Sequence, residues 1–308
     1  MLDDREKKAR TTTWWTCYVL DIVMSIRLGR KPVIRDNDFD VPLPEDPGEL
    51  ADIGLQVFVR VIKLCRLLSH IIDQFYSLRS SSHGAIHLNR YNLDLVQWQN
   101  DLPTSLRIPQ YNNVIHSSVY TMHLLFHTAV LLLHRPFLSN TATRDLSVPI
   151  YRSSAFSSSF ALAQYRADHN YSRSNPFVVH YIFTNAIAHV QSARSNENSV
   201  AQAANFGLQE CLTAFNEIRG TWTVAGRAMD LLVDTFNFGN VIPLPLSATP
   251  IFQEEIMTSA NTELIQLSQE WQSTSPTQSN HDWDGIFEQT SQTPNFEALF
   301  GLNELDLL

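Results

Sequence analysis

Two histidines four residues apart are the closest match in the sequence to a metal site. His123 and His127 would share one face of a helix, which is a spacing that zinc sites use. The Glu of an HExxH pattern does not follow, and the sequence shows no third ligand. The alternative is a pair of histidines packed in an apolar core. We predict the core pair and assign no metal ligand.

The acidic stretch RDNDFD at 35–40 resembles the start of a calcium-binding loop. Such a loop needs Gly at its sixth position and Glu at its twelfth. Val41 and Pro47 stand at those positions, so calcium is not expected.

Other chemistry-bearing patterns are missing from the sequence. It has no GxSxG, P-loop or Rossmann glycine pattern. Its three cysteines, Cys17, Cys65 and Cys211, are far apart and form no CxxC pair, which excludes a cysteine-based zinc site. We therefore predict that the chain is not an enzyme and has no cofactor. A helical enzyme would instead show a pocket with convergent ionisable groups.

The composition predicts a folded body with a different C-terminal tail. The 308 residues are 44% apolar and 17% charged, as in a protein with a packed core. The apolar stretch 114–133 is interrupted by histidines, which favours a buried helix over a membrane span. No signal peptide starts the sequence, so we expect a soluble intracellular protein. No Lys or Arg follows Arg227, whereas 228–308 hold twelve acidic residues, so DNA phosphates would repel this part.

Apolar residues recur at helical spacing through most of the body. The first such face comprises Trp15, Tyr18, Ile22 and Ile26, and Gly29 is a stop signal. Further helices are expected near 55–75, 91–102, 117–134, 151–169, 177–194, 198–219 and 222–236. A polar loop is expected at 139–149, ending in Pro149. We predict an all-α, irregular multi-helix bundle with an extended Pro-rich strap and a largely disordered acidic tail.

The stretch 14–44 resembles the middle homology region of the fungal zinc binuclear cluster transcription factors, also called the fungal-specific or xylanolytic-activator regulatory domain. The pattern is an aromatic pair, a Tyr and an Asp in one helix, a Gly-Arg turn, a Pro, acidic residues and a Val-x-Leu-Pro ending. Thr11–Thr13 stand where the family commonly has Arg. The matching residues are Trp14, Trp15, Tyr18, Asp21, Gly29, Arg30, Pro32, Asp36, Asp38, Asp40, Val41, Leu43 and Pro44, with Trp98 and the later His134, Arg135 and Pro136.

The resemblance implies a division of the chain and a role for it. Residues 1–245 would be the C-terminal part of the regulatory domain, 246–271 a short helical extension and 272–308 a tail. The family's six-cysteine zinc module, which reads DNA, would precede this region and is not in the sequence. DNA and zinc would be bound only by that module. The resemblance also implies action in the nucleus on RNA polymerase II genes.

The residues of the motif can also be explained physically, without reference to the family. The two adjacent Trp rings cover different faces of the helix start. Asp21 lies in an apolar helix and needs a partner, for which Arg30 and Arg35 are the nearest candidates. The Pro-rich segment would cross the helices as an extended strap.

The tail interleaves acids with bulky apolar groups, which is typical of an acidic activation segment that binds a coactivator. The alternative is a last helix packed on the body. A different class of function, an all-α scaffold or small-molecule-binding protein without a transcriptional role, also stays open, as does a small-molecule effector of the helical body. The apolar residues of the candidate segment are Trp283, Ile286, Phe287, Phe296, Leu299, Phe300, Leu302, Leu305 and Leu308.

Overall fold

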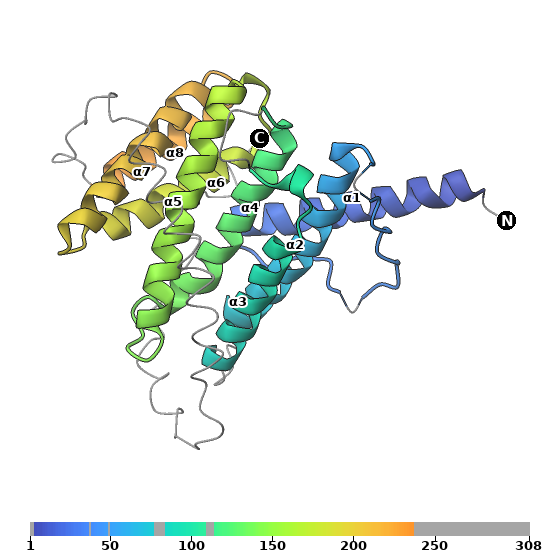
Figure 1. Cartoon of the computed structure of the whole chain (residues 1–308), viewed down its shortest axis with the longest axis horizontal. Coiled ribbons are helices and arrows are strands. Elements are labelled where there is room, and N and C mark those ends of the chain that lie inside the picture. Colours follow the sequence, from blue (N-terminus) through green and yellow to red (C-terminus); the bar gives the residue numbers. More distant parts are fainter. Residues whose placement is uncertain (1–2, 37, 49, 77–83, 109–113, 237–308) are drawn as a thin grey trace, which may run out of the picture. The chain divides into compact units, whose positions relative to one another are not determined.

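The computed structural model describes residues 3–36, 38–48, 50–76, 84–108 and 114–236 (Figure 1). This part of the chain contains α-helices and short 3₁₀ turns and no strand, so the all-α prediction is confirmed for it. It divides into two compact units between Gln99 and Asn100. Among its helices, none has both the length and the apolar character needed to cross a membrane.

The first unit contains three helices: α1 (Asp4–Leu28), α2 (Ile53–Phe75) and α3 (Gly84–Asn100). The apolar face predicted for the first helix is buried, and Gly29 ends α1 in the left-handed conformation, with φ 63°. Asp52 caps α2 by accepting a hydrogen bond from the Leu55 N–H. The strap, residues 30–48, follows α1, and its described residues, 30–36 and 38–48, have no regular secondary structure.

The second unit contains α4 (Ser117–His134), α5 (Arg144–Asp168), α6 (Phe177–Ala193), α7 (Asn198–Ile218) and α8 (Thr223–Phe236). In this unit η1 (Thr104–Leu106) precedes α4, η2 (Arg135–Phe137) joins α4 to α5, and η3 (Tyr171–Arg173) joins α5 to α6. α5 packs against α4, α6 and α7 (Figure 1). Leu131, Tyr151, Ala155 and Ala188 form one core cluster where α4, α5 and α6 meet.

Three helix boundaries differ from the predictions. α1 begins at Asp4, well before the apolar face, and ion pairs Lys7–Asp4 and Arg10–Glu6 line its exposed first turns. α3 begins at Gly84, before the predicted helix start near 91. α5 begins at Arg144 and contains Pro149, so the predicted loop at 139–149 is wrong over its second half. Burial of Leu146 and Ile150 around Pro149 holds that turn helical, although the proline lacks an N–H.

Candidate functional site: the strap and the rings of α1

The first element of the site is the carboxylate of Asp21, which fixes the start of the strap to α1. Its Oδ2 accepts the backbone N–H groups of Val33 at 2.7 Å and Ile34 at 2.8 Å. Its Oδ1 accepts a charge-assisted bond from Arg30 Nη2 at 3.2 Å. The expected partner Arg30 is therefore confirmed, whereas Arg35 lies exposed. An acid on an apolar helix thus satisfies strap backbone that has no ladder of its own.

The second element is Asp36 of the strap, which joins α1 to α2. The Tyr18 hydroxyl donates to Asp36 Oδ1 at 2.6 Å, and Arg66 Nε of α2 donates to Oδ2 at 2.7 Å. His70 Nε2 lies 3.4 Å from the same oxygen. Burial, and then the bond to Asp36, raise the pKa of Tyr18 well above its usual value. Tyr18 therefore stays a neutral donor.

The third element is the aromatic cluster, which comprises Trp14, Trp15 and Tyr18 of α1 and Phe39 of the strap. The Phe39 ring centroid lies 5.3, 5.5 and 5.7 Å from those of Trp14, Trp15 and Tyr18, each pair edge to face. This is a favourable arrangement for aromatic rings. Trp15 Nε1 also donates to the Pro42 carbonyl at 3.0 Å. The indole N–H of Trp14 is buried and has no acceptor.

These contacts define what the site can do chemically. Its carboxylates are engaged in hydrogen bonds and ion pairs that hold the strap. Within the described ranges, no three His, Cys, Asp or Glu side chains are grouped so that they could hold a metal ion. The arrangement is an anchored segment over a set of aromatic rings, a geometry that suits binding.

The structure brings together only part of the residues in the family motif. Pro32 is buried, Asp38 and Asp40 are exposed, and Leu43 is 39% exposed. Trp98, on α3, is buried and donates to the Arg60 carbonyl of α2 at 3.0 Å. The remaining strap residues of the motif, Val41 and Pro44, are partly buried. His134, Arg135 and Pro136 belong to the second unit, at the end of α4 and in η2.

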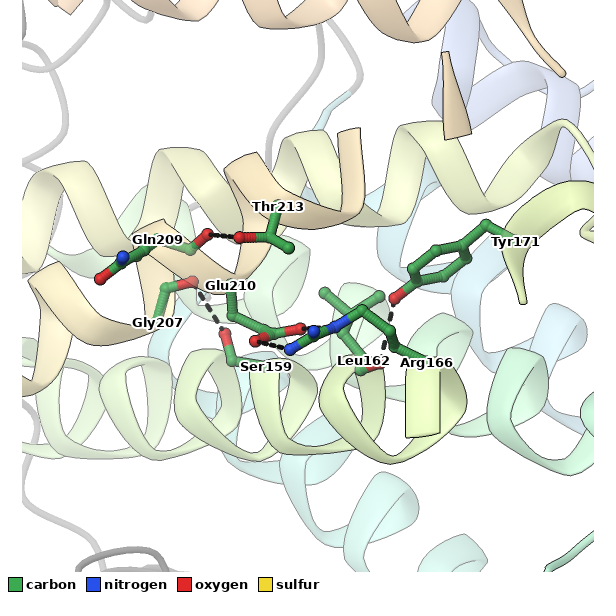
Figure 2. Close-up of polar contacts among 8 residues, drawn as sticks. All are labelled: Ser159, Leu162, Arg166, Tyr171, Gly207, Gln209, Glu210 and Thr213. Carbon is green, nitrogen blue, oxygen red and sulfur yellow. Dashed lines mark hydrogen bonds and ion pairs between the residues drawn. The ribbon is translucent and has the colours of Figure 1, made fainter. Parts of the chain in front are cut away.

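The second unit contains a polar cluster between α5 and α7 that sequence reasoning missed (Figure 2). Arg166 Nε and Nη2 donate to the two carboxylate oxygens of Glu210 at 3.0 and 2.8 Å, a bidentate pair. The Tyr171 hydroxyl donates to the Leu162 carbonyl at 3.0 Å. The hydrogen bonds that Arg166 donates to Glu210 raise the pKa of Arg166. The cluster fixes α5, α7 and η3 together.

A serine–histidine pair lies in the same region. Ser159 Oγ is 2.7 Å from His189 Nε2, and Asn185 Nδ2 donates to Ser159 Oγ at 2.9 Å. Such a pair could be a nucleophile with its base. Ser159 is 3% exposed and His189 2% exposed, and burial lowers the pKa of His189 to about 4. We therefore regard the pair as a structural contact.

The histidines singled out in the sequence lie in the core of the second unit, as predicted. His123 Nε2 is 2.8 Å from the Leu106 carbonyl, and His127 Nδ1 is 3.1 Å from Ser154 Oγ. Burial lowers the pKa of both side chains, that of His127 to about 3. Each ring thus has one nitrogen in a hydrogen bond within the core.

The three cysteines differ in environment. Cys17 on α1 is exposed, whereas Cys65 and Cys211 are buried. Burial raises the pKa of each buried thiol to about 12. The buried pair is therefore unreactive at neutral pH.

The candidate activation segment, from Trp283 to Leu308, lies outside the described residues, as does the predicted extension 246–271. Sequence reasoning also missed Phe39 and Arg66. Phe39 lies between Asp38 and Asp40 in the RDNDFD stretch, and an apolar ring between two acids was the feature that could have indicated a packing role. Arg66 gave no signal, because its partner Asp36 is 30 residues away in the sequence.

Comparison with known proteins identifies the region that contains this site. Residues 1–99 match the model of the fungal specific transcription factor domain. The chain is 27% identical over 246 residues to cutinase transcription factor 1 alpha of Fusarium vanettenii, which covers 72% of this chain and 27% of that protein. It is 30% identical over 167 residues to the nitrogen assimilation transcription factor nit-4 of Neurospora crassa, which covers 46% of this chain and 15% of that protein.

A third relative covers more of both sequences. An uncharacterized transcriptional regulatory protein of Schizosaccharomyces pombe is 22% identical over 291 residues, 80% of this chain and 46% of that protein. The chain therefore spans less than half the length of each of these relatives. No solved structure matches it significantly. The motif at 14–44 lies within residues 1–99, so this part of the all-α described structure is similar to the fungal specific transcription factor domain.

Proposed function

We propose that this chain is the regulatory and activating part of a fungal transcription factor that acts in the nucleus on RNA polymerase II genes. The observation that carries the proposal is the domain match over residues 1–99, together with relatives that are transcription regulators. Specific DNA recognition would belong to a zinc-cluster module outside this chain, and the chain itself would perform no catalysis.

In this proposal the helical body either inhibits the tail or permits it to activate transcription. The body supplies firmly packed helices and a strap held by defined polar contacts, which can change state as a unit. Its effector would be a small molecule or a partner protein. The division into a regulatory body (1–245), an extension (246–271) and an activating tail (272–308) belongs to the same proposal.

The tail would activate by presenting its rings to a coactivator. Acidic neighbours keep apolar side chains in water, and the rings then act as anchors in an apolar groove. Ordering such a segment costs about 2–5 kcal/mol of the gross interaction energy. The net affinity for the coactivator, after this ordering cost, therefore depends on a few large apolar side chains. Phe296 and Phe300 are four residues apart and would share one face of a helix.

A reporter experiment tests this proposal. Residues 272–308 are fused to a heterologous DNA-binding domain, and transcription is measured. We expect activation by the parent tail. We expect Phe296→Ala with Phe300→Ala to lower the reporter output, because each lost anchor costs at least ~1 kcal/mol and coactivator binding should weaken about tenfold or more.

The matched control is Gln289→Ala with Gln292→Ala, which changes two residues of the same tail and removes no ring. This variant should activate like the parent. A silent tail, or equal activation by the parent and the phenylalanine variant, would refute the proposal.

A further inference from the structure

The first turns of α1 form an exposed stretch of helix that contributes no side chain to the core. The buried residues of α1 begin at Trp15. Residues 3–10 are all exposed, and their side chains form ion pairs on the helix surface, such as that of Arg10 with Glu6 at 2.9 Å. Core packing therefore does not determine which residue types occupy these turns.

Three consecutive threonines, Thr11–Thr13, follow this stretch before the first tryptophan. β-Branched residues have a lower helix propensity than Ala, Lys or Glu, so the threonines weaken the helix where they stand. Thr12 and Thr13 are exposed, and the Thr13 hydroxyl donates to the Ala9 carbonyl at 2.9 Å, a local bond within the same turns. The tract thus costs helix stability and adds nothing to the core. Exposed hydroxyl groups of this kind are acceptors for phosphoryl groups.

The residues before Thr13 form the charge pattern that a basophilic protein kinase recognises. Arg10 stands three positions before Thr13, and Lys8 stands five positions before it. Kinases select their substrates by such charge patterns, and a guanidinium binds a carboxylate of the enzyme through two parallel hydrogen bonds. Both basic side chains are exposed. The surface pair of Arg10 with Glu6 contributes little energy, so a kinase can compete for Arg10.

Burial separates Thr13 from other hydroxyl residues that have an arginine three positions before them. In the sequence this spacing occurs at Thr13, Ser69, Ser82 and Ser147. Ser69 is 2% exposed and Ser147 is 0% exposed, so a kinase cannot reach these hydroxyl groups in the folded chain. Ser82 lies outside the described residues. Among the described residues, Thr13 combines the spacing with exposure.

We propose that Thr13 is a phosphorylation site for a basophilic protein kinase. The kinase transfers the terminal phosphoryl group of ATP to Thr13 Oγ. The bond between this phosphorus and the ADP oxygen breaks, a bond to Oγ forms, and the hydroxyl proton passes to the catalytic base of the kinase. Presenting residues 8–13 as an extended segment breaks helical hydrogen bonds near the start of α1 but exposes no side chain of the core. Such a local opening costs little free energy.

Phosphorylation would reverse the sign of the charge at the start of α1. Residues 3–13 include four Lys or Arg and three Asp or Glu, so their net charge is slightly positive. A phosphothreonine carries about −1.5 to −2 charges at neutral pH, which makes the same turns net negative. A partner that binds these turns through charge would then prefer one of the two states. The modification itself requires no transcriptional role of the chain.

A kinase assay on the full chain tests this site. The chain is incubated with Mg-ATP and the catalytic subunit of cyclic-AMP-dependent protein kinase, a basophilic enzyme, and mass spectrometry of its peptides locates the phosphate. We expect phosphate on Thr13. Arg10→Ala should lower kcat/KM for this residue about tenfold or more, because the kinase loses a charge-assisted bidentate contact. An unmodified Thr13, or an undiminished rate with Arg10→Ala, would overturn the proposal.

Lys7→Ala is the matched control for the loss of charge. Lys7 pairs with Asp4 as Arg10 pairs with Glu6, so each variant removes one basic residue and one exposed ion pair from the same helix. Lys7 lies outside the recognition pattern, and its substitution should change kcat/KM by no more than about twofold. An equal loss in both variants would mean that net charge, and not the position of Arg10, attracts the kinase, which contradicts the proposal.

Ser147 provides the control for burial within the same chain. It follows Arg144 by the same three positions but is fully buried. We expect no phosphate on Ser147 while circular dichroism shows that the chain is folded. Phosphorylation of Ser147 and Thr13 at equal rates would mean that exposure does not select the site, and the assignment of Thr13 would then be wrong.

Discussion

Two partly buried carboxylates, each with several donors, hold the strap of the first unit. Asp21 accepts two strap N–H groups and Arg30, and Asp36 accepts Tyr18 and Arg66. Both carboxylate side chains are 11% exposed. Bonds to charged groups in such places contribute more than exposed ion pairs do, because solvent screens them less.

The Asp21 contacts predict a measurable loss of stability. Asp21→Ala leaves the Val33 and Ile34 N–H groups without their acceptor, which should lower the free energy of unfolding by about 1–3 kcal/mol. Urea unfolding followed by circular dichroism measures this loss. Asp38→Ala, an exposed acid of the same strap, should stay within about 0.5 kcal/mol of the parent. Equal losses in both variants would contradict the anchoring role.

At the residue scale, the sequence predicted that a polar side chain requires a hydrogen-bond partner more reliably than it predicted which group that partner is. An acid in an apolar helix must be satisfied, so Asp21 could be identified and Arg30 named. The two backbone N–H groups could not be named, because they depend on the path of a segment without periodicity. The ion pair of Arg166 with Glu210 was equally invisible, since its members lie 44 residues apart on separate helices.

Close approach of α6 and α7 is a contact between whole elements. A Cβ built on Gly207 of α7 would lie 2.2 Å from Cε1 of the His189 ring on α6. No real side chain fits there, so the glycine sets the distance between the two helices.

This contact predicts opposite effects for two glycine substitutions. Gly207→Ala should destabilise the chain by about 1–3 kcal/mol through overpacking. Gly226→Ala on α8, where a new Cβ meets nothing within 4 Å, should stabilise it by about 0.5–1 kcal/mol through helix propensity. Thermal unfolding distinguishes them. In a His189→Ala background the Gly207→Ala loss should shrink, and an unchanged loss would exclude the ring as its cause.

Helices were easier to predict than their ends. The spacing of apolar residues identified all eight described α-helices, because a buried face must repeat at the helical period. The start of α5 was missed because Pro149 is a local stop signal, and tertiary burial of its neighbours overrides it. The start of α1 was missed because its first turns are exposed and have no apolar face to detect.

Buried neutral histidines make the second unit sensitive to acid. Burial lowers the pKa of His127 and His134 to about 3 and that of His189 to about 4. An unfolded histidine titrates near pH ~6.5. Between these values the unfolded chain binds more protons than the folded chain, so stability is full above pH ~6.5 and falls on acidification.

Urea unfolding of the full chain at about pH 7 and about pH 5 tests this dependence. Each such histidine contributes a slope of up to about 1.4 kcal/mol per pH unit. His189→Gln, which cannot take up a proton, should reduce the difference between the two pH values. A difference that His189→Gln leaves unchanged would show that other groups cause it.

Over the whole chain, composition separated the body from the acidic tail, and only the body has described structure. The division at Gln99 could not be read from the sequence, because it lies at the end of α3 with no linker composition to mark it. A unit boundary depends on which helices share a core, and that is a property of long-range packing.

The exposure of Cys17 has a practical consequence for following the strap in solution. Cys65 and Cys211 keep their protons at neutral pH, so a maleimide dye should label Cys17 alone. Cys17 is three residues after Trp14 and four before Asp21, about one helical turn from each. A single fluorophore at this position would report opening of the strap in real time, with no engineered cysteine and no change to the native sequence.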